Sequence, residues 1–225
     1  MRSALIRTLL LSSLVLIFWA RSDKSMAGEA PAGVRVSVTD IGGQSVVNAV
    51  VWYSAKAGSI KSADANEPAV IDQINKQFVP QLTAIRIGTV VEFPNSDSVS
   101  HHVYSFSQPN SFELPLYRGG ETPRIKFLHE GIVTLGCNIH DSMLGYIVVV
   151  DATELAITDK DGIARFARAP SADTDVMIWS PLLGASKPLH AERIESSPGT
   201  LVVRAPMRAG PQPDVRQNSL AWEDY

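Results

Sequence analysis

The feature that most constrains the fold is a succession of short β-branched and aromatic runs with no sustained helical stripe between them. Val34, Val36 and Val38 recur at period two, the spacing of one face of a strand. Short runs with turn residues between them indicate a β-sandwich or barrel. The predicted fold class is therefore all-β, and only EPAVIDQINKQF at 67–78 leaves room for a turn or two of helix. Gly, Pro, Asn or Asp residues separate the runs, which include GVRVSVTD at 33–40, NAVVWYSA at 48–55, LTAIRIGTVVEF at 82–93, GIVTLGC at 131–137 and LGYIVVV at 144–150.

The N-terminal segment has the composition of an export signal. Arg2 and Arg7 precede an apolar stretch at 9–20, and Ser-Met-Ala at 25–27 is a small-x-small cleavage signature. This order of regions predicts a secretory signal peptide over 1–27 and hence a periplasmic protein. The apolar stretch is shorter than the about 20 residues of a membrane span. Basic residues directly after it nevertheless leave an uncleaved anchor open as an alternative.

The charge balance argues against nucleic acid and anionic membranes as partners. The chain has 20 Lys and Arg residues against 23 Asp and Glu residues. Removing the signal segment takes away four basic residues and one acidic residue, which leaves a formal charge of −6. A protein that binds phosphate backbones or anionic lipids needs a basic surface, so neither partner is expected.

Turn residues divide the rest of the chain into zones. A strand–turn–strand unit is predicted near the start, with Gly42 and Gly43 in the turn. The DKDG sequence at 159–162 lacks the further acidic positions of an EF-hand loop, so a tight turn is predicted there rather than a calcium site. The predicted zones are 28–66 (first part of a flanking β unit), 67–150 (the segment with the cysteine and two adjacent histidines), 151–205 (second part of the β unit) and 206–225 (a loosely ordered tail).

The only cysteine, Cys137, lies in the sequence LGCNIHDSMLGY at 135–146. A lone cysteine in an oxidising compartment cannot form an internal disulfide, so it must be buried, paired with another chain or bound to a metal. His140 and Met143 follow it at three-residue steps, so one tight loop between two strands can bring all three together. Thiolate, imidazole and thioether are a ligand set that suits copper. A trigonal site with two histidines and one cysteine requires a further histidine from another strand.

That further histidine is expected at 101–102, where two adjacent histidines follow a polar loop and begin a strand. Alternation points one of them inward. Tyr104 and Phe106 share the face of His102, so periodicity alone favours His102 as the inward residue.

The segment from about 71 to 150 resembles the cupredoxins, the family of plastocyanin, amicyanin and pseudoazurin. NSDSVSHHV at 95–103 is similar to the family's first ligand segment, with His101 in the ligand position and His102 in place of an asparagine. The Cys-x2-His-x2-Met spacing is that of amicyanin, and FVPQLTAIRIGTVVEFPNSD at 78–97 is similar to the strands before the first ligand. The resemblance implies a Greek-key β-sandwich that holds one copper ion. It implies the metal ligands His101, Cys137, His140 and Met143, with His102, Asn95 and Asn138 as supporting residues or, for His102, the alternative ligand.

The longer pattern NSD, HHVYSFS, FELPLYRG and GCNIHDSMLGY looks like the periplasmic subgroup labelled methylamine utilisation proteins. In that subgroup a transthyretin-like or carboxypeptidase-regulatory-like β unit accompanies the copper segment, and residues 33–56 and 156–180 resemble its halves. Two residues depart from the pattern: Ser142 stands where a large aromatic residue is expected, and Ser180 where a histidine is often found.

The resemblance implies a blue copper protein that carries single electrons between redox partners. A periplasmic c-type cytochrome or dehydrogenase is the expected transient partner, with His140 as the electron port and Ile139, Leu144 and Pro115 around it. The alternative is a copper-binding module for storage, delivery or enzyme assembly. Neither a Gly-x-Ser-x-Gly elbow nor a His-Glu-x-x-His helix occurs in the sequence, so an independent enzyme is not expected.

Overall fold

The computed structural model describes residues 33–54 and 67–211. Within these ranges the regular structure consists of strands and one 3-10 turn, so the predicted all-β fold is confirmed. No described helical segment is long and apolar enough to cross a bilayer. The predicted signal peptide lies outside the described residues.

The strands are short, as the spacing of turn residues in the sequence predicts. Their bounds are Val34–Thr39 (β1), Val50–Tyr53 (β2), Ala69–Val70 (β3), Asp72–Ile74 (β4), Gln77–Val79 (β5), Leu82–Arg86 (β6), Val90–Glu92 (β7), Val103–Ser105 (β8), Phe112–Glu113 (β9), Arg124–Lys126 (β10), Gly131–Cys137 (β11), Leu144–Val150 (β12), Glu154–Ile157 (β13), Ile163–Phe166 (β14), Met177–Trp179 (β15), Leu189–His190 (β16), Glu192–Ser197 (β17) and Thr200–Arg204 (β18). The 3-10 turn η1 spans Pro181–Leu183, and the buried hydroxyl of Ser180 accepts a hydrogen bond from Leu182 N–H at its start.

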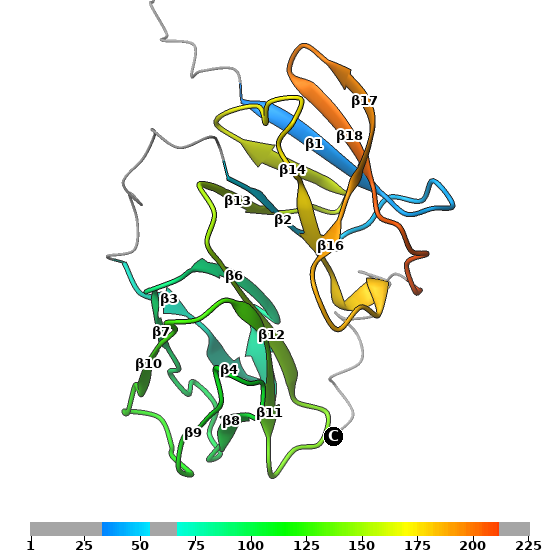
Figure 1. Ribbon diagram of the computed structural model, residues 1–225. Helices are drawn as coiled ribbons and strands as arrows, with labels where there is room; N and C mark the ends of the chain where they lie inside the picture. The colour runs from blue at the N-terminus through cyan, green and yellow to red at the C-terminus, as the bar shows by residue number, and fades with distance from the viewer. Residues whose placement is uncertain (1–32, 55–66, 212–225) are drawn as a thin grey trace, which may run out of the picture. The chain divides into compact units, whose positions relative to one another are not determined.

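Residues 67–150 form a sandwich around one core, which we call the central sandwich. One layer is a five-stranded sheet in the order β6-β12-β11-β8-β9, and a three-stranded sheet β10-β7-β3 and the β4–β5 hairpin complete it (Figure 1). Strands β11 and β12 are antiparallel neighbours, with Gly136 opposite Leu144. Alternate residues of both strands point into the core, where they join the aromatic rings of the other layer. The buried members include Phe93, Phe127, Val133, Leu135, Ile147 and Val149.

The prediction of a turn or two of helix over 67–78 is wrong, because this segment forms β3 and the β4–β5 hairpin. Ile71 and Phe78 are buried, but Ile74, which lies between them at helical spacing, is exposed. Asn75 and Lys76 have φ angles of 52° and 56° and form the turn that pairs Ile74 with Gln77. Two consecutive left-handed residues make a type I′ hairpin turn, which favours asparagine at its first position.

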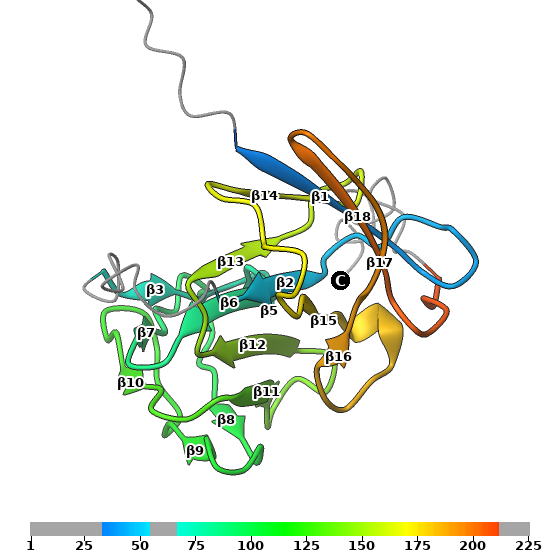
Figure 2. The ribbon, with the colours of Figure 1, turned by 45° about the horizontal axis from the view of Figure 1, so that its top comes forward.

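Residues 33–54 and 154–204 build two four-stranded sheets that share a second core, and we call this part the flanking sandwich. The sheet orders are β14-β1-β18-β17 and β13-β2-β15-β16 (Figure 2). The first and last described strands, β1 and β18, pair in parallel, with Val36 beside Leu201. Buried residues of both sheets fill the core, including Val36, Val38, Val51, Tyr53, Ile178 and Val203.

The predicted strand–turn–strand unit near the start is present, but its two strands, β1 and β2, do not pair with each other. The turn is present, since Gly43 N–H donates to Asp40 C=O and the Asp40 carboxylate accepts from Gly42 and Gln44 N–H. The chain after the turn then crosses to the opposite sheet, so β1 and β2 belong to different layers. Val46 and Ala49 are fully buried on the way, because the hydroxyl of Thr158 satisfies the C=O of Val46 and the N–H of Ala49.

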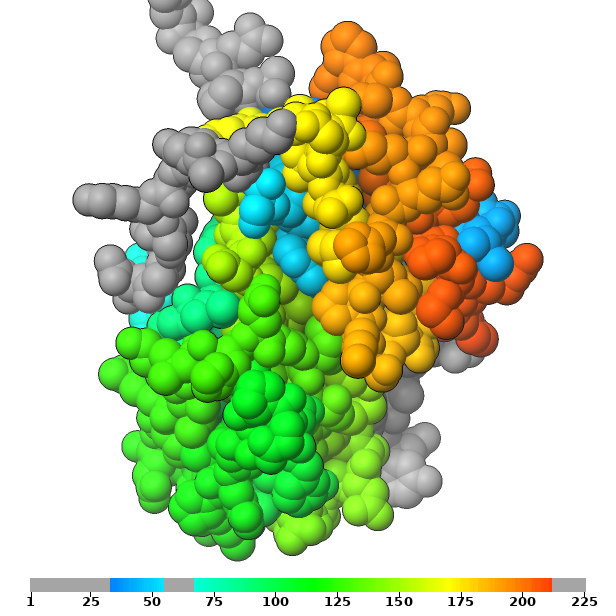
Figure 3. Space-filling view, in the orientation of Figure 1, coloured from blue at the N-terminus to red at the C-terminus, as the bar shows by residue number. Residues whose placement is uncertain are grey.

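A third cluster of buried residues joins the two sandwiches. In β2, Val51 and Tyr53 face the flanking core, whereas Trp52 packs against Val148 and Val150 of β12. Both strands are therefore buried on both faces, which accounts for their near-continuous apolar sequences. In Figure 3 the orange surface of the flanking sandwich adjoins the green surface of the central sandwich. The cluster consists of Val50, Trp52, Val148, Val150, Ala152 and Trp179.

The start of the predicted loosely ordered tail is held by hydrogen bonds. Ile41 N–H donates to Met207 C=O, Ala209 N–H to the Asp40 carboxylate, and Gly210 N–H to Leu182 C=O. Residues 212–225 lie outside the described residues.

We expect the DKDG turn to make stability depend on acid pH. The Arg165 guanidinium beside Asp159, together with backbone N–H groups of the turn, lowers the pKa of the Asp159 carboxyl to about 2. A carboxyl whose pKa is lower in the folded than in the unfolded chain stabilises the fold above its unfolded pKa of about 3.9, and this contribution disappears as the pH falls toward 2.

Urea unfolding of the wild type and Asp159→Asn at several pH values tests this dependence. The difference in the free energy of unfolding between the two proteins should be constant above about pH 5 and shrink between about pH 4 and 2. An equal difference at pH 6 and pH 2.5 would contradict the expected role of the carboxylate.

Candidate metal centre

Backbone pairing fixes two of the predicted ligands in adjacent strands. Cys137 is the last residue of β11 and pairs with Val103 of β8. His101 lies two residues before Val103 and forms a bridge with Tyr117, in which each N–H donates to the other's C=O at 3.0 and 3.1 Å. His101 is fully buried and Cys137 is 4% exposed. The positions of both side chains therefore follow from the sheet.

The loop at 138–143 brings the third residue to them. Met143 N–H donates to His140 C=O at 2.9 Å, which closes a tight turn inside the loop. Aromatic rings cover the glycines at its two ends: a Cβ at Gly136 would lie 2.8 Å from Tyr104 Cζ, and one at Gly145 would lie 3.1 Å from the Phe78 ring. A Cβ at Gly136 would force the Tyr104 ring to shift, and one at Gly145 would press against the Phe78 ring.

The three side chains converge on one point. Cys137 Sγ lies 3.8 Å from His101 Nδ1 and 3.8 Å from His140 Nδ1, and the two imidazole rings are 4.9 Å apart. Three donors about 2.0–2.3 Å from one central ion in a trigonal plane are separated by about 3.5–3.9 Å from one another. The sulfur–nitrogen distances thus have the values required for a shared ion, and His101, Cys137 and His140 can hold a metal.

An aspartate that sequence reasoning did not single out fixes the orientation of His101. Asp97 Oδ2 lies 2.6 Å from His101 Nε2, so Nδ1 on the other side of the ring faces the thiol. Burial raises the pKa of Asp97, but hydrogen bonds from Lys76 N–H, His101 and Asn75 N–H outweigh this effect and lower the pKa overall. Asp97 is therefore a carboxylate at neutral pH. A separation of four positions between an acid and a histidine is common in sequences, so only the fold reveals the contact.

His140 is the more accessible of the two imidazoles. It is half-buried, whereas its neighbours Ile139 and Leu144 are 50% and 41% exposed. Burial, together with the neighbouring His101 and Lys76 side chains, lowers the pKa of His140, which keeps its imidazole neutral and able to bind a metal at neutral pH.

Met143 lies on the inner side of the loop. It is 2% exposed and belongs to the same buried cluster as Cys137. A groove lined by Tyr104, Phe106 and Leu144 has Cys137 and Met143 among its other lining residues.

The remaining predicted residues lie outside the three-residue cluster. His102 points away, and its Nε2 lies 3.0 Å from Glu113 Oε1. Asn95 is buried and stabilises the loop before His101. Its side-chain amide donates to Val99 and Tyr117 C=O and accepts from Asp97 N–H. Asn138 is exposed.

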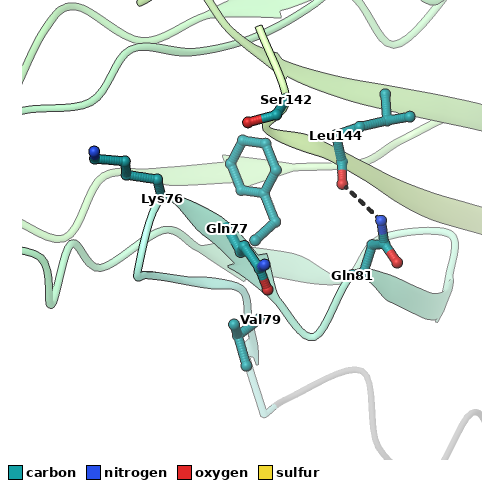
Figure 4. Close-up of a pocket in the computed structure, with 7 residues that line it drawn as sticks. Lys76, Gln77, Val79, Gln81, Ser142 and Leu144 are labelled. Atoms are coloured by element: carbon teal, nitrogen blue, oxygen red, sulfur yellow. Dashed lines mark hydrogen bonds between the residues drawn. The ribbon is translucent and has the colours of Figure 1, made fainter. Parts of the chain in front are cut away.

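Ser142, which replaces the aromatic residue expected from the resemblance, lines a polar pocket beside the loop. Figure 4 shows Ser142 and Leu144 facing Lys76, Gln77 and Gln81 across this pocket, and the Gln81 amide donates to Leu144 C=O at 3.3 Å. The β4–β5 hairpin and Gln81 thus form one wall of the pocket beside the loop at 138–143.

The donor set fits copper. One cysteine sulfur and two imidazole nitrogens within 4.8 Å of one another are the kind of donor set found in copper electron-transfer sites. Within the described residues no carboxylate belongs to the cluster, which disfavours magnesium and calcium.

The sequence matches no protein-family model and no curated protein. The structure is similar to a copper-containing nitrite reductase from Thermus scotoductus SA-01, with 24% identity and a TM-score of 0.37 over 52% of this chain and 28% of that chain. It is also similar to a purple cupredoxin from Nitrosopumilus maritimus, with 26% identity and a TM-score of 0.34 over 36% of this chain and 99% of that one. A reduced mutant amicyanin aligns at 17% identity and a TM-score of 0.36, over 46% of this chain and 99% of that chain.

Proposed function

We propose that this protein is a type 1 (blue) copper protein that carries single electrons between redox partners. The observation that supports this most is the convergence of Cys137 Sγ with His101 and His140 Nδ1 at 3.8 Å, because these distances suit three ligands of one ion. In this proposal Met143 would be a further, weaker ligand of the copper ion. Bound copper would supply a Cu(I)/Cu(II) couple that exchanges one electron at a time.

The protein contributes a rigid and dry site. Strand pairing holds Cys137 and His101, which are 4% and 0% exposed, so their positions need not change when the charge of the ion changes. Four protein ligands leave no strong open position for a substrate, which is why we propose a carrier rather than an enzyme. The partly exposed His140 is the proposed path for the electron to the surface.

The proposed docking surface surrounds His140. Ile139 and Leu144 are exposed and lie close to His140 in sequence. Pro115 is a further exposed apolar residue of the central sandwich. Short-lived redox complexes use small interfaces, below about 1,200 Å². A periplasmic c-type cytochrome or dehydrogenase is the proposed partner, and the periplasm is the proposed location because of the signal-like sequence at 1–27. The methylamine utilisation subgroup and the transthyretin-like character of the flanking sandwich stay predictions.

Titration of the purified mature protein with Cu(II), followed by visible absorption, tests the proposal. We expect an intense thiolate-to-copper charge-transfer band that saturates at about one equivalent, bleaches on reduction and returns on reoxidation. His101→Ala should abolish the band. His102→Ala, a matched change at the next residue, should retain it, since His102 is paired with Glu113 outside the cluster.

The two other outcomes lead to different conclusions. Binding of Cu(I) without a charge-transfer band in the Cu(II) form would replace electron transfer by copper storage or delivery. Absence of binding by either ion would exclude a copper protein of any kind.

A further inference from the structure

Three nitrogen atoms from two parts of the central sandwich lie within hydrogen-bond distance of the Asp97 carboxylate. Asn75 N–H donates to Oδ1 at 2.6 Å, and Lys76 N–H donates to Oδ2 at 2.9 Å. His101 Nε2 lies 2.6 Å from Oδ2. The first two donors belong to the type I′ turn of the β4–β5 hairpin, and the third belongs to a fully buried imidazole.

This geometry selects one form of the histidine. An ionised carboxylate can only accept hydrogen bonds, so Nε2 of His101 must carry the proton. Nδ1 then has its lone pair free, and it is the atom that lies 3.8 Å from Cys137 Sγ. Charge-assisted hydrogen bonds of this length are among the strong ones in proteins.

We propose that Asp97 is a positioning residue of the metal centre, which holds His101 as the Nε2–H tautomer and stabilises the Cu(II) state through its negative charge. The backbone of the β4–β5 hairpin in turn fixes Asp97, so the hairpin is part of the support of the metal site. This inference rests on the proposed copper function for its effect on the metal, but the tautomer is a property of the metal-free chain.

Asp72 provides a matched control. It is a carboxylate of the same hairpin and binds the same loop, since it accepts from Ser96 N–H at 3.1 Å and from Ser96 Oγ at 2.6 Å. None of its hydrogen bonds among the described residues reaches a metal-binding side chain. Asp97→Asn and Asp72→Asn therefore both disturb the attachment of hairpin to loop, but only the first changes the group that contacts His101.

The first measurement uses the metal-free wild-type protein. Long-range ¹H–¹⁵N NMR spectra of the His101 ring should show a proton on Nε2, the atom 2.6 Å from Asp97 Oδ2. An Nε2 without a proton would overturn the proposal, whether or not the protein binds copper.

The second measurement compares the two variants with the wild type. Loss of a carboxylate that orients a metal-binding histidine weakens metal binding by about 10–100-fold, and we expect this loss of Cu(II) affinity in Asp97→Asn. If Cu(I) affinity is unchanged, a tenfold loss raises the one-electron reduction potential by about 59 mV. Asp72→Asn should keep both quantities close to their wild-type values.

The outcomes separate this inference from the proposed function. The wild type could bind copper with the expected band while Asp97→Asn and Asp72→Asn have the same reduction potential and Cu(II) affinity. The proposed role of Asp97 would then be wrong, and the copper function would stand. If the wild type binds no copper, the function and the effect of Asp97 on the metal fail together, and only the tautomer remains to be decided by NMR.

Discussion

Replacement of Cys137 by serine should remove the visible absorption band completely and weaken Cu(II) binding by more than about a hundredfold. The expected loss exceeds the 10–100-fold typical for residues that only support a ligand, because the ligand itself is removed. A serine hydroxyl stays protonated at neutral pH and lacks the soft sulfur that binds copper. Cys137 is the only cysteine of the chain, so no other thiol can replace it.

The fold should survive this substitution, since serine is close to cysteine in size and the site is 4% exposed. Far-UV circular dichroism of the metal-free variant should match the wild type. Ser142→Ala, a change at an exposed residue of the same loop, serves as the control and should leave the band unchanged. If the charge-transfer band persisted in Cys137→Ser, the Cys137 thiolate would not be its source, and the proposed metal centre would be refuted.

Replacement of Trp52 by alanine should destabilise the protein by about 3–5 kcal/mol. The Trp52 side chain is 7% exposed and fills the cluster between the two sandwiches, so its removal leaves a cavity beside Val148 and Trp179. Because β2 also contributes Val51 and Tyr53 to the flanking core, the disturbance extends to both sandwiches. Urea unfolding measured by circular dichroism gives the change in free energy.

Ile41→Ala is the control for this experiment. Ile41 is also apolar but is 52% exposed, so its truncation should change the free energy of unfolding by no more than about 0.5 kcal/mol. The proposed burial is tested by the contrast between the two variants: a loss below about 1 kcal/mol in Trp52→Ala would show that Trp52 is not packed between the sandwiches.

The sequence predicts the kind of structure better than the connections between its strands. Alternation in β1 and continuous apolar runs in β2 and β12 mark strands, and continuous runs indicate strands covered on both faces. Local patterns do not specify which strands pair when the partners are far apart, as in β1 and β18. The unit near Gly43 shows this, because its predicted strands and turn are present but the two strands belong to different sheets.

The candidate metal-binding residues likewise include some that local spacing brings together and one whose position depends on the fold. Cys137, His140 and Met143 are close in sequence, so their spacing alone places them together. For the distant histidine, periodicity favoured His102 because of its apolar neighbours, whereas the structure brings His101 to the thiol. The sequence does not predict the backbone contacts of Asp97, since its two backbone donors lie in the turn of the unexpected β4–β5 hairpin.

The parallel pairing of β1 with β18 has a consequence for the order of events during synthesis and folding. The flanking sandwich joins the first and last described strands, so it cannot be completed until β18 has been synthesised. The central sandwich lies between them in sequence and contains all of its own strands by Val150. The local contacts of the central sandwich can therefore form first. The flanking sandwich is completed only when β18 pairs with β1, after the metal-binding sandwich has folded.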